Sequence, residues 1–278
     1  MNQICIIGCG LIGGSFAALV KKYRPGTTII GMDTNEHHLS MAQAKGLIDS
    51  SAEMLNPDTL TPADLIIIAS PISTVVPIIQ TINATVTTPC TIVECCSVKS
   101  ILNTPIVSNS HHTIVPMHPM GGLDVQGVAH ASVDVLEGCP MIVFEKQHPR
   151  HEWFESCSFQ LVHCPSTDIH DEWMMHISHG PYILASVLPH LLSHKKDHEL
   201  SQLQTISAGG FQDTTRVSNA AIDWGLDILT GNKANAIAFI NQTIASLQAL
   251  QTHLENNDDN KLKHWLSLAK TTRNKIAK

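Results

Sequence analysis

The chain has 278 residues, of which 43% are hydrophobic and 15% are charged. These proportions are typical of a folded protein with a sizeable core, and they exclude a disordered chain. The net charge of -7 and the lack of any basic run argue against nucleic acid as a partner. The length allows one large domain or two ordinary ones.

Cysteine usage and the N-terminus indicate a cytoplasmic protein. The eight cysteines are scattered and form no C-x-x-C pair, which fits reduced thiols better than a disulfide framework. The N-terminus begins directly with a strand-like run and lacks the basic region of a signal peptide. The apolar run at residues 65–82 is interrupted by Pro71 and Pro77, so we do not expect a membrane span.

The 17 histidines raise the question of a metal site. His176 and His179 are three residues apart on a predicted helix, and His170 and Asp171 lie just upstream. However, no spacing of cysteines and histidines matches a structural zinc site, and histidine is also common on solvated surfaces. We therefore predict no metal ion.

A dinucleotide-binding pattern opens the chain. A strand-like run at residues 2–7 leads into G-x-G-x-x-G at residues 8–13, and a helix is predicted over residues 11–23. A second strand at residues 27–32 ends at Asp33, which follows the last glycine of the motif by 20 residues. This order of strand, glycine turn, helix, strand and acid is the fingerprint of a Rossmann-type βαβ unit.

Each position of that pattern has a physical reason. Gly8 allows the tight turn, Gly10 lets the backbone approach a pyrophosphate, and Gly13 lets the helix pack closely on the strand. The helix N-terminus offers amides and a positive dipole end to phosphates. Asp33 would accept hydrogen bonds from ribose hydroxyls and would repel a 2′-phosphate, which favours NAD over NADP. The predicted cofactor-binding residues are Gly8, Gly10, Leu11, Ile12, Gly13 and Asp33, together with Ser70 and Pro71 at the end of a later strand.

Strands and helices continue to alternate up to about residue 167. A helix at residues 35–45 ends at Gly46, and a second helix is predicted at residues 75–82. Further strands are predicted at residues 64–69, 91–95, 113–117, 139–144 and 159–162, the last as an edge strand. This alternation predicts an α/β fold with a doubly wound, mostly parallel sheet.

His118 is the strongest candidate for a catalytic group. It ends the run at residues 113–117, and Pro119 biases it toward an extended backbone. The imidazole should therefore lie at the C-terminal end of a strand, where open α/β sheets bind their ligands. A neutral imidazole at that place can accept a proton near neutral pH.

The pattern becomes helical from about Asp168. A long helix is predicted at residues 171–192, with a kink at Pro181 beside His179 because proline lacks the amide that would bond to Ile177. Residues 208–211 are predicted to form a flexible turn, and Asp213 to cap the helix that carries Arg216. An apolar stripe follows at helical spacing and is typical of core: Ile237, Ile240, Ile244, Leu247 and Leu254. Residues 256–278 are predicted to form a final amphipathic helix.

These halves predict two domains, a Rossmann domain at residues 1–167 and an all-helical domain at residues 168–278. A helical half this small, without a closed pattern of its own, is expected to bury surface against a second copy. We therefore predict a homodimer that forms through the helical domain.

The sequence resembles the prephenate/arogenate dehydrogenase family of tyrosine biosynthesis, and the resemblance extends over nearly the whole chain. Its motifs occur in order: G-L-I-G-G-S at residues 10–15, S-V-K at 97–99, H-P-M-x-G at 118–122, H-D at 170–171 with S-H-x-P at 178–181, A-G-G-F-x-D-x-T-R at 208–216, then Trp224 and Asn232. The resemblance implies an N-terminal NAD domain joined to a helical dimerisation domain.

The resemblance also implies a reaction and the residues that perform it. Prephenate would undergo NAD-dependent oxidative decarboxylation to 4-hydroxyphenylpyruvate and CO2. His118 matches the family's base and Ser97 matches a helper on the same hydroxyl. Arg216 matches an arginine that clamps a substrate carboxylate, for which a rigid bidentate guanidinium is well suited. The other matched substrate-site residues are His179, Asp213, Gly209 and Asp124, the last at the position of a gate residue that is often Glu.

The sequence departs from the family motifs at two positions, and three alternative functions remain open. Cys96 replaces the glycine that usually precedes S-V-K, and Tyr182 replaces a second histidine after S-H-x-P. The alternatives are an arogenate dehydrogenase, a β-hydroxyacid-type dehydrogenase or imine reductase, and a non-catalytic protein that binds NAD. β-Hydroxyacid-type dehydrogenases and imine reductases commonly use a lysine on a C-terminal helix, and the matched segments lack one. A non-catalytic NAD-binding protein would leave the joint occurrence of His118, Ser97 and Arg216 without a reason.

Overall fold

The computed structural model describes residues 2–108, 110–146, 148 and 150–277. The chain divides into two compact units, Met1–Lys233 and Ala234–Lys278. Within the described residues, none of the helices combines the length and the apolar character that a membrane span requires.

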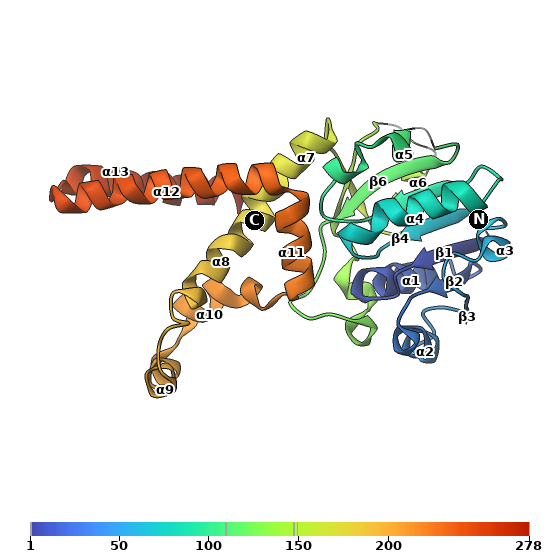
Figure 1. Cartoon of the computed structure of the whole chain (residues 1–278), viewed down its shortest axis with the longest axis horizontal. Coiled ribbons are helices and arrows are strands. Elements are labelled where there is room, and N and C mark those ends of the chain that lie inside the picture. Colours follow the sequence, from blue (N-terminus) through green and yellow to red (C-terminus); the bar gives the residue numbers. More distant parts are fainter. Residues whose placement is uncertain (1, 109, 147, 149, 278) are drawn as a thin grey trace. The chain divides into compact units, whose positions relative to one another are not determined.

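An eight-stranded sheet forms the centre of the first unit, with the order β3-β2-β1-β4-β5-β6-β7-β8. Figure 1 labels β1, β2, β3, β4 and β6 of this sheet. The order reverses between β1 and β4, which is the switch point where doubly wound sheets bind ligands. The strands are β1 (Gln3–Ile7), β2 (Thr28–Met32), β3 (Ser50–Ser51), β4 (Leu65–Ile68), β5 (Thr91–Glu94), β6 (Thr113–Pro119), β7 (Pro140–Val143) and β8 (Gln160–His163).

The strands from β3 to β6 are parallel, whereas β7 runs antiparallel to β6. The central strands are apolar along their whole length because helices cover both of their faces. β4, with the sequence L-I-I-I, is buried at every position. The predicted fold class is confirmed, and the predicted strands lie within about two residues of the observed ones.

One face of the sheet is covered by α1 (Leu11–Tyr23) and α2 (Glu36–Ala44). Phe16 and Leu19 of α1 are buried against Ile4 and Ile6 of β1. The helix α2 ends as predicted, since Gly46 adopts a left-handed backbone with φ of 68°. The same side of the sheet carries two short turns, η2 (Val128–His130) and η3 (Val133–Val135), and α6 (His151–Glu155).

The opposite face is covered by α3 (Pro57–Leu60), α4 (Ile72–Thr85) and α5 (Pro105–Ser108). Ile78 and Ile82 of α4 pack on apolar side chains of β1, β4 and β5. The alternating apolar side chains of each strand therefore supply two separate cores, one on each side of the sheet.

After β8, all regular structure among the described residues is helical. The helices that follow β8 within the first unit are α7 (Thr167–Met174), η4 (Met175–His179), α8 (Gly180–His190), α9 (Asp197–Ile206), α10 (Gly209–Thr215), η5 (Arg216–Asn219) and α11 (Ile222–Gly231). α11 contacts α4, where Asp227 accepts hydrogen bonds from the amide and hydroxyl of Ser73. The predicted change to helical structure after the sheet is confirmed, whereas the domain boundary at residue 168 stays a prediction.

The long helix predicted at residues 171–192 is interrupted by more than a proline kink. Residues Met175–His179 form a single π-helical turn between α7 and α8, and Pro181 lies in the first turn of α8. A π turn contains one more residue than an α turn, so it rotates the following side chains around the helix axis. This turn buries His179 completely.

The structure corrects the prediction for residues 208–213. They do not form a flexible turn, because α10 begins at Gly209 after an extended Ala208. Asp213 lies inside α10 and not at its N-cap, and Arg216 follows at the end of the helix. The two glycines misled the prediction because glycine disfavours helix interiors but is tolerated in a first turn.

The second unit consists of two helices, with α12 (Lys233–Glu255) beginning one residue before it and α13 (Asp259–Ile276) ending it. Asp258 caps α13 by accepting a hydrogen bond from the amide of Lys261. The apolar stripe of α12 is not core in the single chain. Its five side chains, Ile237, Ile240, Ile244, Leu247 and Leu254, are all exposed.

Candidate functional site

The loop between β1 and α1 is built around Gly8. Gly8 has a φ of 92°, in the left-handed region that glycine tolerates best. A Cβ on Gly8 would lie 2.6 Å from the carbonyl oxygen of Ala69, because the loop presses against the end of β4. The loop after β4, with Ser70 and Pro71, therefore lies directly beside the glycine turn at the switch point of the sheet.

The start of α1 shows why its glycines are needed. A Cβ on Gly13 would lie 1.9 Å from the carbonyl oxygen of Gly8, so only glycine fits there. At Gly10 the space is open, with no atom within 4 Å of the position of a Cβ. No side chain caps the helix at Gly10, which leaves the first amides of α1, including those of Leu11 and Ile12, without a side-chain acceptor from the cap residue.

Asp33 is tied to the glycine turn. One carboxylate oxygen accepts a hydrogen bond from the amide of Cys9 at 2.8 Å, and the other accepts one from the amide of Asn35 at 2.8 Å. The ring of His38 lies 3.4 Å from the same carboxylate. The carboxylate thus stands at the edge of the loop and remains partly exposed.

His118 belongs to a chain of buried polar groups. It lies near the C-terminal end of β6, where it pairs with Ile142 of β7. Its Nδ1 atom is 2.9 Å from Nε2 of His170 on α7, and Nδ1 of His170 is 2.7 Å from Oδ1 of Asp171. The exposed fractions of these residues are 8%, 0% and 1%. The sequence placed His170 and Asp171 beside a possible metal site and in a family motif, but it gave them no role in the reaction.

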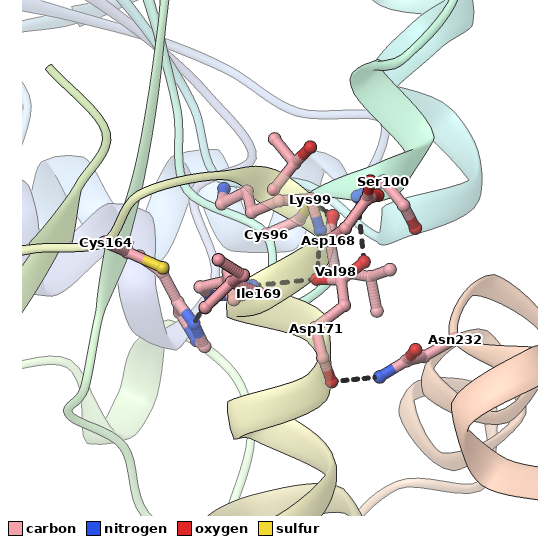
Figure 2. A network of polar contacts seen from close by, with 12 residues as sticks. Cys96, Val98, Lys99, Ser100, Cys164, Asp168, Ile169, Asp171 and Asn232 are labelled. Carbon is pink, nitrogen blue, oxygen red and sulfur yellow. Dashed lines mark hydrogen bonds and ion pairs between the residues drawn. The ribbon is translucent and has the colours of Figure 1, made fainter. Parts of the chain in front are cut away.

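The carboxylate of Asp171 is held by the loop that follows β5 (Figure 2). Its two oxygens accept hydrogen bonds from the amides of Lys99 at 2.7 Å and Ser100 at 2.8 Å. Figure 2 also shows the side chain of Asn232 reaching the backbone of Asp171, whose carbonyl oxygen accepts a hydrogen bond of 2.8 Å from Nδ2. The loop after β5 therefore contacts the carboxylate of Asp171 on α7, and the end of α11 contacts the backbone carbonyl of the same residue.

A buried ion pair lies beneath this loop. Nζ of Lys99 is 2.5 Å from Oε2 of Glu94, and both side chains are fully buried. The other oxygen of Glu94 accepts a hydrogen bond from the amide of Cys96. The Cys96 thiol donates to the carbonyl oxygen of Val98 at 2.9 Å. Cys96, which replaces a glycine of the family pattern, is thus accommodated inside the loop that carries Ser97.

Ser97 itself is half-buried in this loop. β5 and β6 are parallel neighbours, with Glu94 paired to Pro116, so the residues that follow them lie at the same edge of the sheet. Ser97 and His118 therefore come from adjacent strand ends. Within the described contacts, the hydroxyl of Ser97 forms no hydrogen bond to another protein group.

Burial sets the protonation states of the histidines. It lowers the pKa of His118 well below its usual range, and the positive charge of Lys99, together with those of His170 and His179 when they are protonated, acts in the same direction. Burial also lowers the pKa of His170, although Asp171 partly opposes this. The pKa of Asp171 falls below its usual value, because hydrogen bonds from His170, Lys99 and Ser100 outweigh the effect of burial. At neutral pH this series of buried groups therefore consists of the neutral imidazoles of His118 and His170 and the carboxylate of Asp171.

His179 lies at the end of the π turn, near α11. Its Nδ1 atom is 3.3 Å from Nδ2 of Asn232, and its ring is 6.4 Å from that of Trp224. Burial lowers its pKa to about 4, and its Nε2 atom is buried without a hydrogen-bond partner among the described residues. Tyr182 packs on Trp224 at 5.2 Å, and its hydroxyl sits on Gly225, where a Cβ would be 2.1 Å away.

Arg216 and Asp124 form an ion pair of 3.5 Å, with 60% and 39% of their side chains exposed. Asp124 lies in the loop that follows β6, six residues after His118 in the sequence. Gly209 and Asp213 are exposed neighbours on α10, where a Cβ on Gly209 would lie 3.1 Å from Oδ2 of Asp213. No hydrogen bond among the described residues links Arg216, Gly209 or Asp213 to the histidine chain.

The structure therefore forms three groups from the predicted residues: the glycine turn with Asp33, Ser70 and Pro71; His118, His179 and their buried partners; and the exposed pair of Arg216 and Asp124. Among the described residues, no three side chains of histidine, cysteine, aspartate or glutamate are arranged to hold a metal ion. All eight cysteines are free thiols.

Comparison with known families gives two matches. Residues 16–164 match the model of the nucleotide-binding domain of prephenate dehydrogenase, and residues 166–268 match the model of the prephenate dehydrogenase dimerization domain. The two matches meet within the short segment between β8 and α7.

Individual relatives cover almost the whole chain. A prephenate dehydrogenase of Lactococcus lactis is 28% identical over 98% of this chain and 77% of its own. A cyclohexadienyl dehydrogenase of Zymomonas mobilis is 27% identical over 95% of this chain and 92% of its own. The crystal structure of an Aquifex aeolicus prephenate dehydrogenase with hydroxyphenyl propionate and NAD+ covers 99% of this chain and 98% of its own, with a TM-score of 0.85 and 25% identity. With its nucleotide-binding model covering more than half of the residues, this chain belongs to the prephenate dehydrogenase family.

Proposed function

We propose that this protein is an NAD-dependent prephenate dehydrogenase, which converts prephenate to 4-hydroxyphenylpyruvate and CO2. The observation that carries the proposal is a buried, neutral imidazole, that of His118, at the C-terminal end of a strand beside the nucleotide-binding fold. Family membership supplies the substrate class.

The glycine turn fits a dinucleotide. The open space at Gly10 leaves room for a pyrophosphate next to the uncapped N-terminus of α1, where amides and the helix dipole favour negative charge. Leu11 and Ile12 belong to this N-terminus, and Ser70 and Pro71 follow β4 beside the glycine turn. NAD would accept a hydride from the ring carbon that bears the hydroxyl. Asp33 would bind the ribose hydroxyls, and its negative charge favours NAD over NADP.

His118 would act as the general base. It would accept the proton of the substrate hydroxyl as the carbonyl forms, and Ser97, on the adjacent strand end, would donate or accept a hydrogen bond at the same oxygen. A base must be unprotonated to work, and the lowered pKa of His118 keeps it so at neutral pH. Loss of CO2 from the ring then produces the aromatic product.

Arg216 would hold a substrate carboxylate. Its guanidinium is exposed and, among the described residues, forms one weak ion pair, with Asp124, so it can exchange that partner for a substrate. In this role Asp124 acts as a gate. His179 would contribute to the substrate pocket, with Gly209 and Asp213 near its entrance. The match to a dimerization domain supports a homodimer in which helices of the C-terminal region form the contact.

The experiment is NADH formation by the purified protein with each pairing of NAD or NADP with prephenate or arogenate. We expect the largest kcat/KM for prephenate with NAD. Absence of NADH formation with every pairing would refute the proposal and would favour a non-catalytic NAD-binding protein.

Arogenate is the second candidate substrate, and Tyr182 is the observation that favours it. Tyr182 replaces a histidine of the family pattern and packs on Trp224, close to His179. A change of side chain there can alter which side-chain group of the substrate is recognised, since prephenate carries a keto group where arogenate carries an amine. A larger kcat/KM for arogenate would establish this alternative.

A further inference from the structure

The buried partners of His118 have an arrangement that suits a second role in the reaction proposed above. We propose that His170 and Asp171 are positioning residues that fix the tautomer of His118 and stabilise its protonated form. This inference rests on the proposed function, since it concerns the same base.

The assignment starts from Asp171. Its carboxylate is ionised, because hydrogen bonds from His170 and from the amides of Lys99 and Ser100 hold its pKa below the usual value in spite of burial. An ionised carboxylate only accepts hydrogen bonds. The contact of 2.7 Å to Nδ1 of His170 therefore requires a proton on that nitrogen.

The proton positions then follow along the chain. A neutral imidazole carries one N–H, so His170 with its proton on Nδ1 has an unprotonated Nε2. The contact of 2.9 Å between this Nε2 and Nδ1 of His118 needs a donor, and only His118 can supply it. The remaining nitrogen of His118, Nε2, is then the one that lacks a proton. Asp171 thus determines, through His170, that His118 offers a proton acceptor on Nε2.

The hydrogen bonds from Asp171 through His170 to His118 also stabilise the protonated form of His118. Burial disfavours an imidazolium at this place, and so do Lys99 and any positive charge on His170 or His179. Two carboxylates favour the imidazolium: Asp171, which is linked to His118 through His170, and Glu94, which is paired with Lys99. When Nε2 of His118 takes the substrate proton, its Nδ1–H still donates to His170, and no other proton has to move. The negative charge of Asp171 then stabilises the new positive charge across His170.

A purely structural role is the competing explanation, because Asp171 also joins α7 to the loop after β5. The two explanations differ in what they predict for His118. A structural role predicts that replacing Asp171 lowers thermal stability and leaves the titration of His118 unchanged. A positioning role predicts a changed tautomer and a changed pH dependence in a folded protein.

The decisive variant is Asp171→Asn. Oδ1 of Asp171 accepts from both the amide of Lys99 and Nδ1 of His170, and Oδ2 accepts from the amide of Ser100. An asparagine whose oxygen keeps the Ser100 contact gives up the Lys99 contact and turns its NH2 group, a donor, toward Nδ1 of His170. This reverses both imidazoles, so His118 would carry its proton on Nε2. We expect kcat to fall by roughly 10²–10⁴, the range for loss of a correctly protonated base, with KM changed less than about threefold. The acid limb of kcat/KM should move to lower pH, because the charged form of His118 loses its stabilising partner.

A conservative variant and a matched control accompany it. His170→Gln keeps a polar group able to accept from Nδ1 of His118 but breaks the link to Asp171, so its kcat should lie between those of wild type and Asp171→Asn. The control is His112→Gln. His112 is also buried, but it precedes the N-terminal end of β6, whereas His118 lies near the C-terminal end of that strand. Because His112 contacts Cys90 and not the site, kcat and the acid limb should stay at wild-type values.

Histidine tautomers are read directly from 15N chemical shifts of histidine-labelled protein, which requires no turnover. Wild type should show His118 protonated on Nδ1, and Asp171→Asn should show it on Nε2. An unchanged tautomer and acid limb, with activity lost only in proportion to thermal stability, would overturn the positioning role. If wild type formed no NADH, the proposed function would fail, while the tautomer measurement would still decide the assignment of His170 and Asp171.

Discussion

At the scale of single residues, the burial of His118 has a measurable effect on the pH dependence. The pKa of His118 lies well below its usual range, because burial disfavours the charged ring. The base works only when neutral, so lowering the pH reduces activity only as it approaches this lowered pKa. We expect kcat/KM for prephenate to stay level from pH 8 to below about 6.5, the usual pKa of histidine, and to fall only as the pH approaches the lowered pKa of His118. A pH–rate profile with an acid limb above 6.5 would contradict this.

Two substitutions separate chemistry from binding. His118→Asn removes the base and should lower kcat by roughly 10²–10⁴ while KM stays similar. Arg216→Gln removes one charge-assisted contact, worth about 1.5–3 kcal/mol, and should appear mainly as a higher KM. Steady-state kinetics with prephenate measures both. The same small loss in both variants would show that these roles are wrongly assigned.

At the scale of elements, the first turn of α1 depends on Gly13. A Cβ at that position would lie 1.9 Å from the carbonyl oxygen of Gly8, and backbone cannot give way cheaply. We expect Gly13→Ala to lower the free energy of unfolding by about 1–3 kcal/mol and to raise the KM for NAD. The control is Gly26→Ala, since a Cβ on Gly26 meets no atom within 4 Å. Urea unfolding and NAD titration measure the two effects, and equal behaviour of both variants would argue against the close approach.

The helices α7 and η4 bury histidines whose neutrality links stability to pH. The pKa of His179 falls from 6.5 to about 4 because of burial, so the unfolded chain binds a proton between these values that the folded chain does not. Stability is therefore complete above pH 6.5 and decreases as the pH falls toward 4. With about 1.36 kcal/mol per pKa unit, His179 alone should cost ~2 kcal/mol at pH 5.

Urea unfolding at pH 7.5 and pH 5, at one protein concentration, tests this prediction. His179→Gln removes the titrating group and should make the pH dependence shallower. If the variant and wild type lost the same free energy between the two pH values, His179 would not be the source of the loss.

At the scale of the whole molecule, the exposed stripe of α12 bears on assembly. Ile237, Ile240 and Ile244 are spaced as on one face of a helix, and water contacts them in the single chain. We expect a homodimer that covers this face. Ile244→Asp should shift the protein toward monomer in analytical ultracentrifugation, whereas Gln242→Asp, which alters an exposed polar residue on the opposite face of α12, should leave the dimer intact. A wild-type monomer at micromolar concentration would contradict the expectation.

The sequence predicted local features better than long-range ones. The spacing from the glycine motif to Asp33 and the apolar strand-like runs predicted the Rossmann fold, because both patterns are local in the chain. The contact between His118 and His170 joins residues 52 positions apart, so no spacing rule could find it. The π turn was missed because its hydrophobic pattern resembles that of an ordinary helix. The cap assigned to Asp213 was wrong because the preceding glycines were taken as a break in the helix.

The double engagement of Asp33 limits how the coenzyme preference can be re-engineered. The oxygen that bonds to the amide of Cys9 also steadies the turn on which the phosphates would rest. Exchanging Asp33 for a neutral residue would remove the repulsion of a 2′-phosphate, but it would also release that turn. A switch of preference to NADP therefore requires a replacement that can still accept from Cys9, such as Asn, combined with a new cation elsewhere on α2.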